Sequence, residues 1–117
     1  MESLERIIPH IPSADMAKTI DFMVSVFKFK SSPQIETYSE LSSGNNVLGV
    51  LSSQGEPNQQ SIYLQVQDVD ALWDNIEPKL KNTKTKPPFN QAYGMREFHV
   101  IIPSTNTLLF VGSQQNA

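Results

Sequence analysis

The sequence predicts an α+β fold built from two βαβββ modules in tandem. Two observations predict it. A strand-like segment followed by an amphipathic helix occurs near the N-terminus and again in the second half of the chain. The aspartates that open the two helices, Asp15 and Asp68, are 53 residues apart, close to half of the 117-residue chain. We therefore interpret the chain as a duplicated unit within a single domain over 1–117, with modules at 6–52 and 61–112.

The first module begins with a short apolar run, Arg6–Ile11, and prolines at 9 and 12 suit a strand at the edge of a sheet. Asp15 then marks a helix start, because its carboxylate accepts hydrogen bonds from the free amides of a first turn. Apolar residues recur at helical spacing as far as Phe27, and this predicts a helix over 14–27. The remaining strands of this module are expected at 29–37, 38–43 and 46–52.

The second module follows a polar connection over 52–61. Residues 61–67 alternate between apolar and polar, which is typical of a half-buried strand. Asp68 is expected to cap a second helix, and Pro78 to kink it or end it early, since proline lacks an amide hydrogen. The last two strands are expected at 95–102 and 107–112.

Between the second helix and these strands lies a basic tract over 79–86, followed by two prolines. We interpret the tract as a solvated helix exit that complements the helix dipole. The prolines are expected to begin a loop that carries Phe89 and Tyr93.

Composition excludes several classes of function. The formal charge of −3 and a pI near 5.2 argue against a nucleic-acid-binding protein, whose domain pI is usually above about 9. The absence of cysteine excludes disulfides, thiolate metal sites and cysteine nucleophiles. No apolar run approaches the roughly 18 residues of a membrane span, and the N-terminus does not resemble a signal peptide. We expect a soluble, cytoplasmic protein with neither a nucleic-acid nor a membrane partner.

Three stretches of the sequence are similar to one known group of proteins. They read IPHIPSAD at 8–15, VQDVDAL at 66–72 and YGMREF at 93–98. In this order and at this spacing, the chain resembles the vicinal oxygen chelate superfamily, which includes glyoxalase I, extradiol dioxygenases, and fosfomycin- and bleomycin-resistance proteins. The resemblance covers about 6–112 and implies two curved mixed sheets around a cavity, the glyoxalase/bleomycin resistance fold.

Enzymes of this superfamily hold a divalent metal ion with His, Glu or Gln side chains on the first, fifth and last strands. The resemblance places these positions at Ile8, at Ser61 or Ile62, and at Leu109. A catalytic ion needs about three nitrogen or oxygen ligands from the protein, and these side chains do not supply them. We therefore expect no metal site and no cofactor, and we lean against an enzyme.

Five residues are candidates for ligand binding: His10, Phe89, Tyr93, Arg96 and Phe98. His10 has the strand parity of a cavity-facing residue, although a histidine bonded to backbone at a strand end is the simpler interpretation. Phe89 and Tyr93 lie in the expected loop ahead of the cavity, where aromatic rings line ligand entrances. Arg96 either pairs with an acid or faces the ligand. No catalytic residue is assigned.

The resemblance is closest to the metal-free, bleomycin-resistance-like members, which sequester a small organic molecule in a crevice commonly shared across a dimer. We therefore predict a homodimeric small-molecule-binding protein, related to antibiotic-resistance proteins. The alternatives are a metal-dependent lyase, dioxygenase or thiol transferase of the same superfamily, or a degenerate member that binds no ligand.

Overall fold

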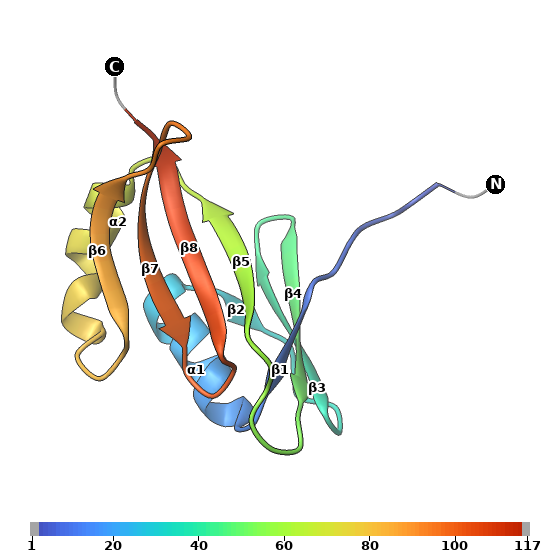
Figure 1. The fold of residues 1–117 in the computed structure, drawn as a ribbon. Coiled ribbons are helices and arrows are strands. Elements are labelled where there is room, and N and C mark those ends of the chain that lie inside the picture. The colour runs from blue at the N-terminus through green and yellow to red at the C-terminus, as the bar shows by residue number, and fades with distance from the viewer. Residues whose placement is uncertain (1–2, 116–117) are drawn as a thin grey trace.

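The computed structural model describes residues 3–115 and contains two mixed four-stranded sheets (Figure 1). The first sheet has the order β1-β4-β3-β2 and the second has the order β5-β8-β7-β6. The strands of the first sheet are β1 (His10–Ser13), β2 (Lys30–Ser31), β3 (Tyr38–Ser43) and β4 (Asn46–Ser52). Those of the second are β5 (Gln60–Gln65), β6 (Thr85–Asn90), β7 (Met95–Ile102) and β8 (Thr107–Gln114). The helices are α1 (Met16–Phe27), α2 (Val69–Ile76) and the short 3₁₀ helix η1 (Glu77–Lys79).

Both predicted capping aspartates are confirmed, and α1 begins at Met16 rather than at residue 14. The Asp15 carboxylate accepts from the Lys18 amide at 3.2 Å, and the Asp68 carboxylate accepts from the Ala71 amide at 3.1 Å. The α-helical turns of α2 stop at Ile76, and Pro78 lies in η1, so the helix ends early as expected. In each sheet the first strand pairs in parallel with the last, β1 with β4 and β5 with β8.

The structure corrects two predicted segments. The strand expected over 29–37 is only Lys30–Ser31, because Pro33 lacks an amide hydrogen and the chain then turns, with Glu36 at a φ of 53°. The region expected as a basic helix exit and a loop contains β6, which includes Pro87 and Pro88. Prolines are tolerated there because β6 is an edge strand, and its register against β7 shifts between Lys86 and Phe89.

The end of α1 stores a small amount of backbone strain. Lys28 has φ 63° and ψ 28°, the left-handed conformation that glycine adopts most readily. A side chain in this conformation costs roughly 1 kcal/mol. The turn lets the Lys28 amide donate to the Met23 carbonyl and directs the chain into β2.

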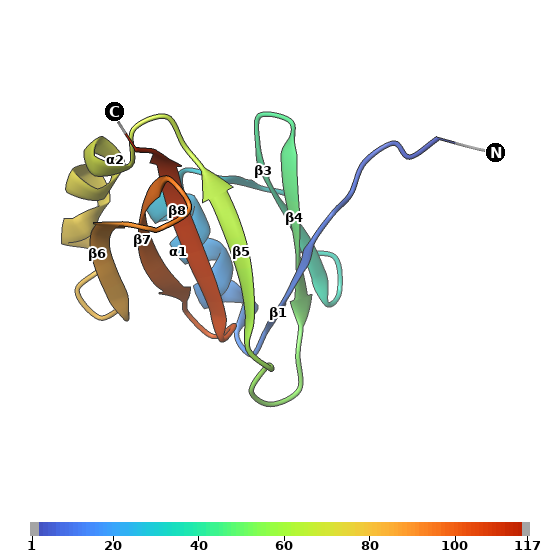
Figure 2. The same ribbon diagram turned by 45° about the horizontal axis from the view of Figure 1, so that its top comes forward.

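The two faces of the second sheet have different surroundings. Both α1 and α2 lie behind this sheet in Figures 1 and 2, and α2 contacts β6, β7 and β8. Phe98 points to the helix side, where its ring lies 5.0 Å from that of Trp73 on α2, between ring centroids. The opposite side, which carries Glu97 and His99, is covered by neither helix. We call it the open face of the second sheet.

The apolar core joins the two halves of the chain. Ile11, Met23 and Val50 from the first half and Phe98 and Val111 from the second belong to one cluster of buried side chains. Among the described residues, no helix is long and apolar enough to cross a membrane.

Candidate functional site

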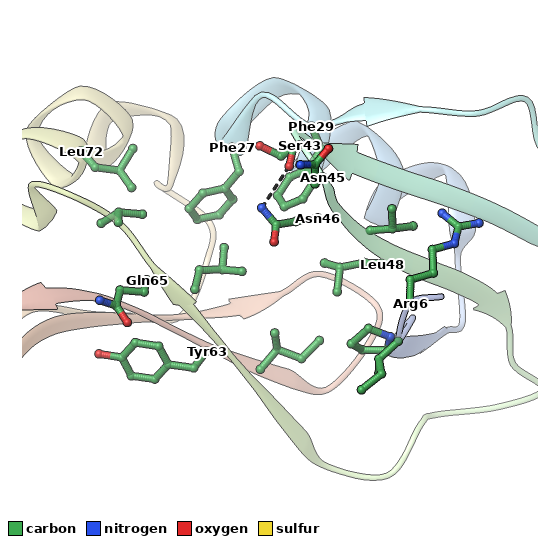
Figure 3. Close-up of a pocket in the computed structure, with 16 residues that line it drawn as sticks. Arg6, Phe27, Phe29, Ser43, Asn45, Asn46, Leu48, Tyr63, Gln65 and Leu72 are labelled. Carbon is green, nitrogen blue, oxygen red and sulfur yellow. Dashed lines mark hydrogen bonds between the residues drawn. The ribbon is translucent and has the colours of Figure 1, made fainter. Parts of the chain in front are cut away.

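A groove of about 690 Å³ lies between the two sheets and has walls from both halves of the chain (Figure 3). Its first wall is the β3–β4 hairpin and the end of α1, and its second wall is β5 with one residue of α2. Arg6, Ile7 and Pro9, from the segment that precedes β1, border one side of the groove. The lining residues are Arg6, Ile7, Pro9, Phe27, Phe29, Ser43, Asn45, Asn46, Val47, Leu48, Ile62, Tyr63, Leu64, Gln65, Val66 and Leu72.

The groove combines apolar walls with a few polar groups. Phe27 and Leu48 point into the space between the hairpin and β5 in Figure 3. Asn46 is oriented by its own hairpin turn, because its amide donates to the Ser43 carbonyl at 3.1 Å. Such a mixture is typical of sites that enclose small organic molecules. The volumes of such sites run from about 300 to 1,000 Å³.

A second cluster of polar residues lies on the open face of the second sheet. We call it the Glu97 cluster, and it consists of Glu97, His99, Gln91, Tyr63 and Tyr93. Glu97 is fully buried, and its carboxylate contacts all four other side chains. One oxygen accepts from the Tyr93 hydroxyl and from the Tyr63 hydroxyl, the latter at 3.4 Å. The other accepts from the Gln91 amide at 3.4 Å and lies 2.5 Å from His99 Nε2.

Strand register explains why these side chains meet. Glu97 on β7 stands opposite Gly112 on β8, and Gly112 stands opposite Gln65 on β5. Because Gly112 has no side chain, the Tyr63 hydroxyl crosses over it to reach Glu97. Two residues further along β7, on the same side of the strand, His99 stands opposite Phe110. The two rings meet edge to face, with 4.4 Å between their centroids.

Three pKa values are shifted in the cluster: that of Glu97 is lowered, and those of Tyr93 and Tyr63 are raised, the last chiefly by burial. Burial alone raises the pKa of Glu97, but the hydrogen bonds from Tyr93, His99 and Gln91 outweigh it and hold that pKa below its ordinary value. The pKa of Tyr93 is raised to about 12, chiefly because its hydroxyl donates to Glu97 and also because of partial burial. At neutral pH the cluster therefore holds an ionised carboxylate bonded to neutral tyrosines.

The first sheet contains a similar but smaller arrangement. Glu40 on β3 stands opposite Gly49 on β4, and Gly49 stands opposite His10 on β1. The Tyr38 hydroxyl donates to Glu40 at 3.0 Å, and the Tyr38 ring meets the His10 ring edge to face at 5.7 Å. The Glu–Gly pairing thus occurs in both sheets, as a duplicated unit predicts.

The five predicted ligand-binding residues lie in different places. Phe89 and Tyr93 are on the open face beside His99 and Glu97. His10 is on the first sheet, against Tyr38. Arg96 pairs with Asp70 on α2 at 3.0 Å, so the acid-pairing alternative is the one observed. Phe98 is fully buried against Trp73 on the helix side and is no part of any surface, so we do not retain it as a ligand-binding residue.

The prediction missed the most densely bonded group, which is centred on Glu97 and His99. The pattern Glu97-Phe98-His99 shows that the two polar residues share a face of β7. It does not show that Gln91, Tyr63 and Tyr93 converge on them. A cavity between the sheets was expected, but none of the five candidate residues lines the groove, because its walls come from segments far apart in the chain.

The residues at the positions that the sequence resemblance assigns to metal ligands do not fit a metal ion. Ile8 precedes β1, Ser61 and Ile62 offer a hydroxyl and an alkyl group, and Leu109 is fully buried in the core. The β8 residues beside Leu109, on the opposite side of the strand, are Leu108 and Phe110, which also lack metal-binding atoms. Within residues 3–115, no three His, Asp or Glu side chains are placed to share an ion.

Comparison with known proteins finds similarity in structure alone. No family model and no curated protein matches the chain. A bleomycin-binding protein from Streptomyces verticillus, solved with copper(II)-bleomycin, has a TM-score of 0.80 at 17% identity, covering 98% of this chain and 100% of its own. The bleomycin resistance determinant of transposon Tn5 has a TM-score of 0.81 at 18% identity, covering 97% and 100%. A glyoxalase/bleomycin resistance protein/dioxygenase from Nocardioides has a TM-score of 0.78 at 8% identity, covering 100% and 88%.

Proposed function

We propose that this chain, which has the tandem fold of the glyoxalase/bleomycin resistance proteins, binds and sequesters a small organic molecule without a catalytic metal. The observation that carries the proposal is the groove of about 690 Å³ between the two sheets. Solved proteins of the same fold that bind bleomycin add support. The residues at the superfamily's metal positions supply no ligand set, so we derive no metal-dependent reaction.

The proposed mechanism is burial of apolar ligand surface, with polar groups fixing the orientation. Phe27, Leu48 and Leu72 supply the apolar contact area. Each Å² of apolar surface removed from water contributes roughly 25 cal/mol, before the cost of immobilising the ligand. Arg6 and Gln65 lie at the same groove and offer hydrogen-bond donors to a ligand.

Filling the groove should abolish binding. Leu72 is half-buried on α2 and lines the groove, so Leu72→Trp places a large ring in the space that a ligand would occupy. We expect isothermal titration calorimetry of the wild-type protein with bleomycin and with 8-anilinonaphthalene-1-sulfonate to detect binding of at least one probe. The Leu72→Trp variant should bind that probe about tenfold more weakly or not at all.

The matched control is Ala71→Trp, which adds the same ring at the adjacent, exposed position of α2. This variant should bind like the wild type. Equal binding by both tryptophan variants would place the ligand outside the groove, and absence of binding by the wild type to either probe would contradict the proposed function.

We also propose a cytoplasmic homodimer, each chain being one domain of modules 6–52 and 61–112. The segment before β1 supports the dimer, since it extends away from the body in Figure 1 and exposes 83% of Leu4 and 77% of Ile7. Contact with a second chain would remove this apolar surface from water. Light scattering after size exclusion should give the mass of two chains, and Leu4→Ser with Ile7→Ser should shift the mass toward one. A monomeric wild type would contradict the dimer.

A further inference from the structure

The groove between the two sheets holds a single charged side chain. Among the described residues that line it, Arg6 alone carries a charge, and none is an aspartate or a glutamate. The other lining side chains are apolar or carry neutral hydroxyl and amide groups. A cation that enters the groove meets no carboxylate on its walls, whereas an anion meets a guanidinium. The charge of the lining residues therefore favours an anionic ligand.

The Arg6 guanidinium is not hydrogen-bonded to its charge partner. That partner is Glu40, and the nearest nitrogen and oxygen of the pair are 4.0 Å apart, beyond hydrogen-bonding distance. Glu40 has a closer contact with the Tyr38 hydroxyl, which donates to it at 3.0 Å. A guanidinium presents several N–H donors in a planar fork that matches a carboxylate. Arg6 can therefore turn to a ligand carboxylate without leaving Glu40 unpaired.

An apolar strip runs along the wall that β5 contributes to the groove. The Tyr63 hydroxyl reaches Glu97, so Tyr63 points to the open face of the second sheet. Because side chains alternate along a strand, Ile62, Leu64 and Val66 point the other way, toward the helices. We call these three residues the apolar strip. They are half-buried and pack against the core, and they span about 13 Å of extended chain.

The strip leads away from the charged group. In Figure 3, Arg6 lies at one end of the groove and Leu72 at the other, and β5 runs between them with Gln65 on the Leu72 side. Phe27 and Leu72 are half-buried and line the groove on that side as well. A ligand that lies lengthwise in the groove therefore meets a positive charge at one end and apolar side chains along its body.

We propose that the groove takes an amphipathic carboxylate, which is an unbranched alkyl chain that ends in a carboxylate group. The carboxylate accepts hydrogen bonds from the Arg6 guanidinium, and the alkyl chain lies along the apolar strip toward Leu72. A row of aliphatic side chains matches an extended alkyl chain, which has no polar atom for the strip to leave unpaired. This inference rests on the proposed function and deepens it by naming the class of ligand.

The preference for a negative charge is tested with dodecanoate and dodecyltrimethylammonium, which share an alkyl chain and carry head groups of opposite charge. Isothermal titration calorimetry at neutral pH, below micelle-forming concentrations, should show that the wild-type protein binds dodecanoate more tightly by about tenfold or more. Arg6→Gln removes the charge and keeps a polar side chain. This variant should bind dodecanoate about tenfold more weakly, the effect of losing a charge-assisted hydrogen bond.

The matched control is Lys18→Gln, which removes one positive charge at an exposed position of α1 outside the groove. It should bind dodecanoate like the wild type. Arg6→Glu should reverse the preference, so that the cationic probe binds more tightly than dodecanoate. Equal weakening by Arg6→Gln and Lys18→Gln, or equal affinity of the wild type for the two probes, would overturn the proposal.

The length of the alkyl chain tests the apolar strip. From octanoate to decanoate, the affinity should rise by up to about fourfold for each added methylene, which is the effect of burying one CH₂ group. The Leu72→Trp variant, whose added ring blocks the course of the chain, should lose most of this increase. An affinity that does not change with chain length in the wild type would place the alkyl chain outside the strip and overturn the proposal.

The probes of the proposed function separate its failure from the failure of this inference. If bleomycin or the naphthalene probe binds and Leu72→Trp weakens that binding, while dodecanoate does not bind, the groove is a ligand site and only the ligand class is wrong. If none of the probes binds the wild type, the proposed function itself is contradicted.

Discussion

Gly112→Ala is expected to lower the free energy of unfolding by about 2 kcal/mol, within the range for forcing an extra carbon into a packed site. A Cβ at position 112 would lie 2.9 Å from the Arg96 carbonyl oxygen and 3.0 Å from Glu97 Cβ, and it would also meet the Tyr63 hydroxyl. The Tyr63 hydroxyl is the end of a side chain that is 39% exposed and can rotate, but the Arg96 carbonyl belongs to the backbone of the adjacent strand. The overlap with the added Cβ is therefore relieved only if β7 and β8 move apart at the Glu97 cluster.

The matched control is the corresponding glycine of the first sheet. A Cβ at position 49 would lie 2.7 Å from the His10 ring and 2.7 Å from the Tyr38 hydroxyl, and its nearest neighbours are all side-chain atoms. These rings rotate away at little cost, so Gly49→Ala should destabilise by less than about 1 kcal/mol. Urea denaturation followed by circular dichroism measures both values. Equal losses would show that backbone contact at Gly112 does not set the cost.

Glu97→Gln is expected to cost about 2 kcal/mol at neutral pH. The change removes a buried charge that accepts four hydrogen bonds and puts an amide donor where an acceptor was. Hydrogen bonds to charged groups contribute about 1.5–3 kcal/mol each, and the tyrosine hydroxyls recover part of the loss by rotating to accept. Urea denaturation at neutral pH should show the loss, whereas Glu56→Gln at an exposed position should change stability by less than about 0.5 kcal/mol.

The same carboxylate gives a pH dependence with a definite sign. Because the folded-state pKa of Glu97 is held below its ordinary value of about 4.3, its stabilisation is present above that value. It is lost as the pH falls through the lower folded-state pKa. The stability difference between the wild type and Glu97→Gln should therefore shrink below about pH 4. A difference that stays constant down to acid unfolding would contradict a lowered pKa for Glu97.

Stretches whose structure depends on near neighbours in the chain were predictable. Asp15 and Asp68 cap their helices through bonds to amides three residues ahead, so each start is a local event. Strands β3 and β4 were predicted with their observed bounds, because they form one hairpin around Gly44, whose φ is 58°. By contrast, β6 was not predicted. Its prolines are tolerated only at the edge of a sheet, and the sequence does not show which strand lies at an edge.

The candidate sites were less predictable because they depend on register between strands. Tyr93 was predicted to face a ligand, which stays a prediction. Its partner Glu97 was not singled out, since nothing local indicates that four donors converge on that carboxylate. The metal position at Leu109 was estimated by counting along the chain. The structure shows that this side chain points into the core, so a shift of one residue decides which side of β8 it occupies.

By itself, the sequence predicted the capping aspartates of both helices, the β3–β4 hairpin and the identity of the side chains at the positions that the resemblance assigns to metal ligands. These properties follow from residue identity and from short-range periodicity. Only the tertiary structure decided that Gly112 leaves room for Tyr63 to reach Glu97, and which residues line the groove between the sheets. The physical reason is that each of these features joins strands that are distant in the chain, and cross-strand register is set by packing of the whole fold.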